Sequence, residues 1–242
     1  MSAPVRQHGC GSDQTMPEID LATVSVSELN RRLHRIDGHA EDLAWRVCSP
    51  RGQHSIAVGL DAPAEVVIEG PVGYYCGGMN KHASIVVHGN AGPGLAENIM
   101  SGSVRVTGSA SQYAAASGHG GLVVVEGDAA ARCGVSMKGV DIVVGGSVGH
   151  MSAFMAQAGN LIICGDAGHH LGDSIYEAHV FVRGEVDSLG SDCVEKELRP
   201  EHHETLDRLL QTAGLKADAG DFRRYGSARQ LYNFHIDNVG AY

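Results

Sequence analysis

The histidines of this sequence are the side chains best suited to bind a metal or move a proton, and two of them share a spacing. His150 and His169 lie 19 residues apart, each four residues after a glycine, Gly146 or Gly165. If this spacing is one turn of a repeating structure, the two imidazoles stack about 5 Å apart on neighbouring turns. A zinc site would need a third and a fourth ligand in similar register. We interpret both as surface or interface histidines, with a metal site as the alternative.

Carboxylates, serines and glycines do not combine into a catalytic pattern. Asp128 and Asp166 directly follow glycines, but Asn, Ser and Pro stand at the same place in other repeats. We therefore expect these acids to shape turns rather than to act as a catalytic pair. The phosphate-loop order G-x-x-x-x-G-K-[ST] and a G-x-G-x-x-G order between a strand and a helix are absent. The sequence predicts no catalytic, cofactor-binding or metal-binding residue in this chain.

One glycine recurs every 19 residues through the middle of the chain. The series is Gly70, Gly89, Gly108, Gly127, Gly146, Gly165 and Gly184. A fixed period of this length is typical of solenoids, in which each repeat buries its apolar face by stacking on the next. Only small residues stand seven positions after each glycine, as expected where φ is positive or backbones approach closely. We expect the seven glycines to lie at structural turns.

Apolar, mostly β-branched residues stand two and four positions before each glycine. The nearer column reads Ile68, Val87, Val106, Val125, Val144, Ile163 and Val182. A spacing of two puts both columns on one face of a short strand. One strand per repeat, all running the same way, predicts an all-β fold: a parallel β-helix of about seven 19-residue coils over residues 65–184. At about 4.8 Å per coil the rod is roughly 34 Å long.

The composition limits the partners and the compartment. The chain has 242 residues, 43% of them hydrophobic, and its 18 basic and 28 acidic residues give a net charge of −10. An acidic chain without a basic run is unsuited to nucleic acid or to an anionic membrane. No stretch approaches the length of a membrane span, and the N-terminus lacks the layout of a secretion signal. We expect a cytoplasmic protein whose six cysteines are all reduced.

The sequence before the repeats predicts a tail, a helix and two strands. Residues 1–18 show no periodicity and are expected to form a flexible tail. In residues 19–64, Ser25 and Glu28 have the capping-box spacing, which predicts a helix over about residues 26–35, and strands are predicted at 45–47 and 55–58. The basic side chains of the helix are interpreted as a solvated face, with an anion site as the alternative: Arg31, Arg32 and Arg35.

Residues 185–242 are predicted to hold a helix and a partner-binding tail. The helix begins at Pro200 and ends before Gly214, and we expect it to cap the last coil, as the first helix caps the other end. The tail, residues 222–242, concentrates aromatic residues among arginines, which is the composition of an interface core. The alternative is a tail that folds back on its own β-helix. The candidate interface residues are Phe222, Arg223, Arg224, Tyr225, Tyr232 and Phe234.

The glycine spacing resembles that of a known family. The order G-x-x-G-x-x-x-G is complete in the coils that begin at Gly70 and Gly165, with Ala or Ser replacing Gly in the others. This pattern is similar to the C-terminal β-helix domain of the large subunit of glutamate synthase. The flanking segments IDLATVSVSELNRRLH and YGSARQLYNFHIDN resemble the free-standing form of that domain, which is a subunit of N-methylglutamate synthase and of related complexes.

The resemblance implies a fold, a reaction and partners. It implies a right-handed β-helix, in agreement with the handedness of parallel crossovers. It implies a complex that makes N-methylglutamate and ammonia from methylamine and glutamate. The partners would be an amidotransferase-like subunit and a glutamate-synthase-like subunit that binds FMN and an iron–sulfur cluster. This chain would be the non-catalytic piece between them, beside the path of ammonia.

Two other interpretations stay open. One is a β-helix subunit of another oxidoreductase complex, such as the formylmethanofuran dehydrogenase type, which molybdenum or tungsten proteins encoded nearby would favour. The other is an independent β-helix enzyme.

Overall fold

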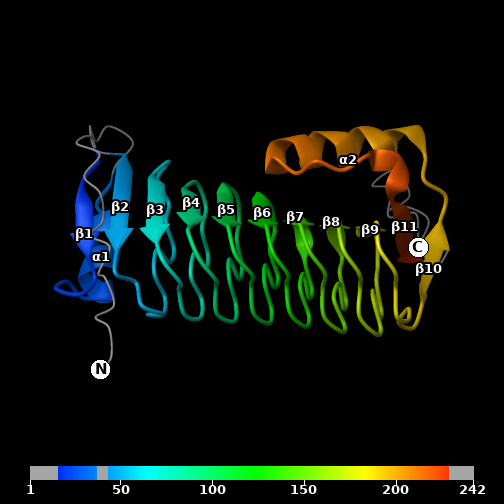
Figure 1. Cartoon of the computed structure of the whole chain (residues 1–242), viewed down its shortest axis with the longest axis horizontal. Coiled ribbons are helices and arrows are strands. Elements are labelled where there is room, and N and C mark those ends of the chain that lie inside the picture. The colour runs from blue at the N-terminus through cyan, green and yellow to red at the C-terminus, as the bar shows by residue number, and fades with distance from the viewer. Residues whose placement is uncertain (1–15, 37–42, 229–242) are drawn as a thin grey trace, which may run out of the picture.

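One long sheet runs the length of the molecule in the computed structural model, which describes residues 16–36 and 43–228 (Figure 1). Its strands are β1 (Glu18–Asp20), β2 (Ala44–Cys48), β3 (Glu65–Glu69), β4 (Ser84–Val87), β5 (Ser103–Val106), β6 (Leu122–Val125), β7 (Lys138–Val144), β8 (Ala158–Ile163), β9 (His179–Val182), β10 (Cys193–Lys196) and β11 (Arg223–Ser227). The strands from β1 to β9 stack in sequence order, and each pairs in parallel with the next. The predicted all-β parallel β-helix of about seven coils is confirmed.

The coils have the predicted length, and the ladder begins before the first predicted coil. Glu65 pairs with Ser84, and Ser84 pairs with Ser103, so one coil is 19 residues. β1 and β2 extend the same parallel ladder toward the N-terminus. The predicted strand at 55–58 is wrong, because these residues form the turn of that coil with Ser55 and Ala57 at positive φ.

The recurring glycines lie at the ends of the strands, where neighbouring coils come closest. The N–H of Gly108 donates to the carbonyl of Gly89 at 3.0 Å, and the same bond recurs in each coil to Gly184. A Cβ on Gly184 would lie 2.7 Å from the carbonyl carbon of Gly165. The members from Gly108 to Gly184 do not adopt positive φ, so close approach alone requires glycine there.

The residue after each of these glycines forms a second ladder through its side chain. Asp128 Oδ1 accepts the N–H of Ser147 at 2.7 Å, and Ser147 Oγ accepts the N–H of Asp166 at 2.9 Å. The sequence predicts that Asp128 and Asp166 shape turns; in the structure each carboxylate accepts a backbone N–H of the next coil. Acceptors in this ladder are Asn90, Ser109, Asp128, Ser147 and Asp166.

Each turn contains three alternating residues in the left-handed region of φ. In the coil after Gly108 they are Tyr113, Ala115 and Ser117, with φ of 65°, 55° and 54°. Their N–H groups bond alternately to the coils on either side: Ala115 donates to Leu95 at 2.7 Å and Ser117 donates to Val135 at 2.8 Å. The middle residue is buried, which explains why only Gly or Ala stands there.

The molecule has one core inside the rod and another on its outer face. Inward side chains such as Val66, Ile85 and Val104 are fully buried in the inner core. The outer core joins α2 (Pro200–Ala213) to an apolar residue on each of four strands, Val124, Val143, Ile162 and Phe181.

The helix α2 lies along the side of the rod, over its last strands (Figure 1). The expectation that it caps the last coil is wrong, because the outward residues of β6 to β9 are apolar and offer it a buried face. Arg105, in the same outward position on β5, donates to the last carbonyl of the helix, at Ala213, over 2.7 Å. β11 instead pairs antiparallel with β9 at this end of the sheet, and β10 lies beyond β11.

The first helix, α1 (Val26–Leu33), forms where the capping box predicts it. Leu29 and Leu33 are buried in the inner core beside the first coil. Neither helix is long and apolar enough to cross a membrane, among the residues described.

The cysteines differ in state. Cys76, Cys133, Cys164 and Cys193 are free and buried, and burial raises the pKa of Cys76 and of Cys133 to about 12. Cys48 is disulfide-bonded, so the prediction that all six are reduced is wrong for Cys48.

Candidate partner-binding site

His150 and His169 lie in adjacent coils and are exposed to solvent. His169 Nε2 lies 3.9 Å from Asp187 Oδ2, and its Nδ1 lies 3.5 Å from Ser188 Oγ. His150 is likewise exposed. In the part of the chain that is described, no three His, Cys, Asp or Glu side chains come together as metal ligands. His150 and His169 are therefore surface residues.

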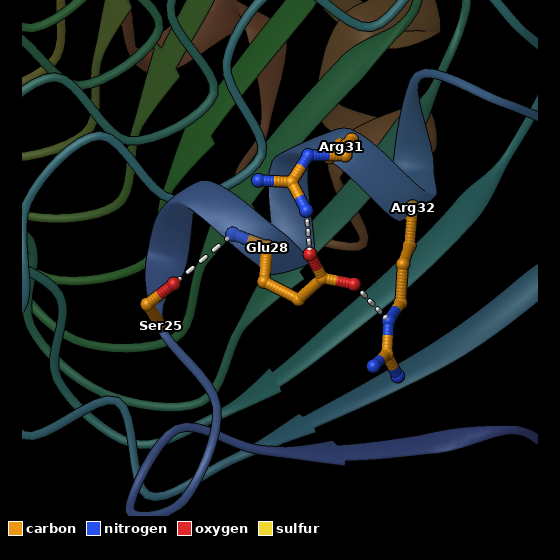
Figure 2. A network of polar contacts seen from close by, with 4 residues as sticks. All are labelled: Ser25, Glu28, Arg31 and Arg32. Carbon is orange, nitrogen blue, oxygen red and sulfur yellow. Dashed lines mark hydrogen bonds and ion pairs between the residues drawn. The ribbon is translucent and has the colours of Figure 1, made fainter.

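The helix α1 carries a network of charged side chains on its solvent side (Figure 2). Ser25 Oγ accepts the N–H of Glu28 at 3.2 Å, which caps the helix. The Glu28 carboxylate contacts both Arg31 and Arg32, with Arg32 Nε at 2.9 Å. The hydrogen bond from Arg32, followed by the charge of Arg31, lowers the pKa of Glu28. Two of the predicted basic side chains are thus held by an acid of their own helix.

A shallow depression of about 510 Å³ lies where α1 meets the first coil, and two of its lining residues fasten the helix to the rod. Asn30 Nδ2 donates to the carbonyl of Ser55 at 2.8 Å, and Asn30 Oδ1 accepts the N–H of Ala57 at 3.0 Å. His34 Nε2 lies 2.7 Å from the carbonyl oxygen of Val58. These polar groups are occupied in holding α1. The lining residues are Val26, Ser27, Asn30, Arg31, His34 and Ser55.

The predicted C-terminal interface residues fall into two groups, and the aromatic ones in the described part are buried. Phe222 and Tyr225 are only 4% and 3% exposed; Phe222 joins the outer core and Tyr225 the inner core. Through residue 228 the tail therefore follows the alternative, folding back on its own rod. Tyr232 and Phe234 lie outside the described residues and stay predicted interface residues.

The two arginines of the predicted interface lie on β11 and bond to this chain. Arg223 Nη2 donates to the carbonyl of Gly184 at 2.7 Å, beside the end of β9. Arg224 Nε donates to the carbonyl of Glu197 at 2.9 Å. Both hydrogen bonds fix the end of the rod.

A pair of histidines that the sequence did not single out meets at the start of α2. His179 on β9 and His202 on α2 make an edge-to-face contact, with ring centroids 5.2 Å apart. His202 Nδ1 accepts the N–H of Arg199 at 3.0 Å, which closes the first turn of α2. Burial, then the charges of Arg224 and His202, lower the pKa of His179 to about 4. Burial, then Arg224, lowers the pKa of His202 as well.

Comparisons with known proteins place the chain in a family. No family model matches it, and no solved structure matches it. It is 65% identical over 228 residues to Protein GlxC of Rhizobium meliloti (strain 1021), and this match covers 94% of the chain and 100% of that protein. At this identity and coverage, the chain belongs to the family of Protein GlxC.

Proposed function

We propose that this chain is the structural subunit of a glutamate-synthase-like complex. The proposal is supported by the resemblance of its 19-residue glycine repeat to the β-helix domain of glutamate synthase. It is also consistent with a solenoid fold whose strands pair in sequence order from β1 to β9. In this role the chain bridges an amidotransferase-like subunit and a glutamate-synthase-like subunit.

The uninterrupted bonding between coils is the observation that carries the proposal. From Gly89 to Gly184, each coil is joined to the next by the strand ladder, by the glycine-to-glycine bond and by the side-chain acceptor after the glycine. Three sets of hydrogen bonds along one rod resist bending and shear. A stiff rod can hold two partner proteins at a fixed separation and orientation, as a site assembled from several chains requires.

In its specific form the proposal is an N-methylglutamate synthase, which converts methylamine and glutamate to N-methylglutamate and ammonia. FMN and an iron–sulfur cluster belong to the synthase-like partner. The interior of this rod is filled by apolar side chains of the inner core, among them Val104, Val123 and Ile142, each 0% exposed. A path for ammonia or an amine would therefore run outside the rod, between it and a partner.

Affinity purification of the tagged full chain from its native source tests this function. The expected result is co-purification of an amidotransferase-like chain and a yellow, flavin-bearing chain, identified by mass spectrometry and an absorbance spectrum. Methylamine and glutamate should then give N-methylglutamate with the complex, and the isolated chain should be inactive. Recovery of an active monomer, or of a colourless chain without partners, would contradict the proposal. Molybdenum or tungsten in the purified complex would instead support the formylmethanofuran dehydrogenase type.

A further inference from the structure

Most of the large apolar side chains exposed in the described residues lie on one edge of the turns. Met79, Met100, Met155 and Tyr176 are 47%, 46%, 39% and 50% exposed. Met79 and Met155 each stand nine residues after a glycine of the column, whereas Met100 and Tyr176 each stand eleven after one. These four residues are called the methionine edge below.

The methionine edge consists of two pairs built in the same way. Met100 donates its N–H to the carbonyl of Asn80, the residue after Met79, at 2.8 Å. Tyr176 donates its N–H to the carbonyl of Ala156, the residue after Met155, also at 2.8 Å. The second pair follows the first by 76 residues, which is four coils of 19. At about 4.8 Å per coil, the two pairs are about 19 Å apart.

A basic stretch separates the two apolar pairs. His119 and Lys138 are exposed and occupy the same column as Met100 and Tyr176, one in each intervening coil. Within residues 16–36 and 43–228, Lys138 forms no ion pair with an acidic side chain. The edge therefore reads apolar, basic, apolar along the rod, on a chain whose net charge is −10.

We propose that the methionine edge binds an amphipathic α-helix of a partner subunit. The apolar residues of this partner helix would lie at two points about 19 Å apart, which is three to four helical turns. An acidic side chain of the helix between these points would face Lys138. Methionine and tyrosine are enriched in protein interfaces, and the flexible methionine side chain adapts to a ridged helix surface. The identity of the partner as a subunit of the complex rests on the proposed function.

The backbone of the edge favours a helix over an added strand. The N–H of Met79 donates to Glu97 and that of Met155 donates to Asp173, at 2.8 and 2.9 Å. With the bonds of Met100 and Tyr176, all four N–H groups of the edge are used between coils. A partner strand would find none of these donors free, whereas a helix satisfies its own backbone and needs only side-chain contacts.

The test compares variants of the tagged full chain for assembly with the native complex. Met79→Asn with Met155→Asn replaces one methionine of each pair. The change suits the backbone, because both positions have positive φ and Asn98, in the same column, has φ of 56°. We expect at least about tenfold weaker association from this double variant, and weaker association from Lys138→Glu. Tyr74→Ser is the control for Tyr176→Ser, since both tyrosines are 50% exposed and Tyr74 lies outside the edge. Unchanged thermal unfolding of each variant shows that the rod is intact.

A photo-crosslinking residue at Ser117, between the two pairs, identifies what binds. Cross-links to an acidic helical segment of a co-purifying subunit support the inference. Cross-links to a second copy of this chain or to a non-helical segment overturn it. The inference is also overturned if the double variant assembles into the complex with the same affinity as the wild-type chain. In that last case the proposed function still stands. Cross-links to an acidic helix of a protein unrelated to either expected partner support helix binding at the edge but overturn the assignment of its partner to the proposed complex.

Discussion

The side chain of Asp128 occupies the space that a Cβ on Gly146 would need. From that place its Oδ1 accepts the N–H of Ser147, the residue after Gly146. The same relationship joins Ser147 to Gly165 and Asp166 to Gly184. The glycine column and the polar column therefore depend on each other. Because the glycine of one coil has no side chain, the polar acceptor of the preceding coil has room beside it.

Replacing Gly146 with alanine tests this dependence. Gly146→Ala should lower the free energy of unfolding by about 1–3 kcal/mol, because the new Cβ meets both Asp128 and the backbone of Gly127. Gly127→Val, with a larger side chain, should prevent folding. Gly226→Ala is the control, because its Cβ meets nothing closer than 3.8 Å. Denaturant unfolding measures all three, and equal losses at Gly146 and Gly226 would refute the steric account.

The acceptor itself should contribute a smaller amount. Asp128→Ala leaves the N–H of Ser147 without its protein acceptor, and we expect a loss of about 1 kcal/mol. Asp128→Ser should retain most of the stability, since Ser109 and Ser147 serve as acceptors in the same column. Chemical denaturation of the two variants compares them directly. A serine variant no better than alanine would show that a hydroxyl cannot replace the carboxylate at this coil.

The inward-facing side chains and the register of the coils could be predicted from the sequence, because every repeat has the same pattern and therefore the same geometry. The columns before the recurring glycines fix which side chains face inward, and their spacing fixes the register. The position of α2 could also have been foreseen. The outward column changes from Arg105 to Val124, Val143, Ile162 and Phe181, a run of apolar residues that needs a cover.

The candidate sites were harder to predict because they join segments without a common period. His179 and His202 lie 23 residues apart on a strand and a helix, so no spacing pairs them. The burial of Phe222 and Tyr225 depends on the insertion of β11 between β9 and β10, which composition does not reveal. An aromatic and basic tail has the composition of an interface and equally that of a closing strand.

His179 should make the stability of the protein depend on pH. Burial lowers its pKa from 6.5 to about 4, so between these values the unfolded chain binds a proton that the folded chain does not. Stability should be full above pH 6.5 and fall as pH drops toward 4. His179→Asn should weaken this dependence. The measurement is the urea midpoint of wild type and variant at each pH across this range. Subtracting one curve from the other removes the contribution of carboxyl groups with lowered pKa values, such as Glu28. Parallel curves would exclude His179 as the cause.

The outer core should hold α2 independently of the inner one. Leu206 is 0% exposed and belongs to the outer core, where it packs with Phe181 and the other outward apolar residues. Leu206→Ala should cost about 2–5 kcal/mol, by the loss of burial and the cavity that remains. Limited proteolysis should then cut near the end of α2 while the parallel coils stay protected. Cleavage spread evenly along the chain would show instead that α2 and the rod unfold together.

Two truncations separate the structural part of the C-terminal segment from its predicted partner-binding part. Ending the chain after Asp221 removes β11, and with it Tyr225 from the inner core and the strand between β9 and β10. We expect that variant to lose stability, so a loss of assembly would not identify an interface. Ending the chain after Ala228 keeps β11 and the bond from the N–H of Ala228 to the carbonyl of Asp192, at 2.6 Å, while it removes Tyr232 and Phe234. This shorter deletion should leave the unfolding midpoint unchanged and abolish co-purification of at least one partner. If the complex forms normally without residues 229–242, the interface lies elsewhere, and the methionine edge becomes the first surface to test.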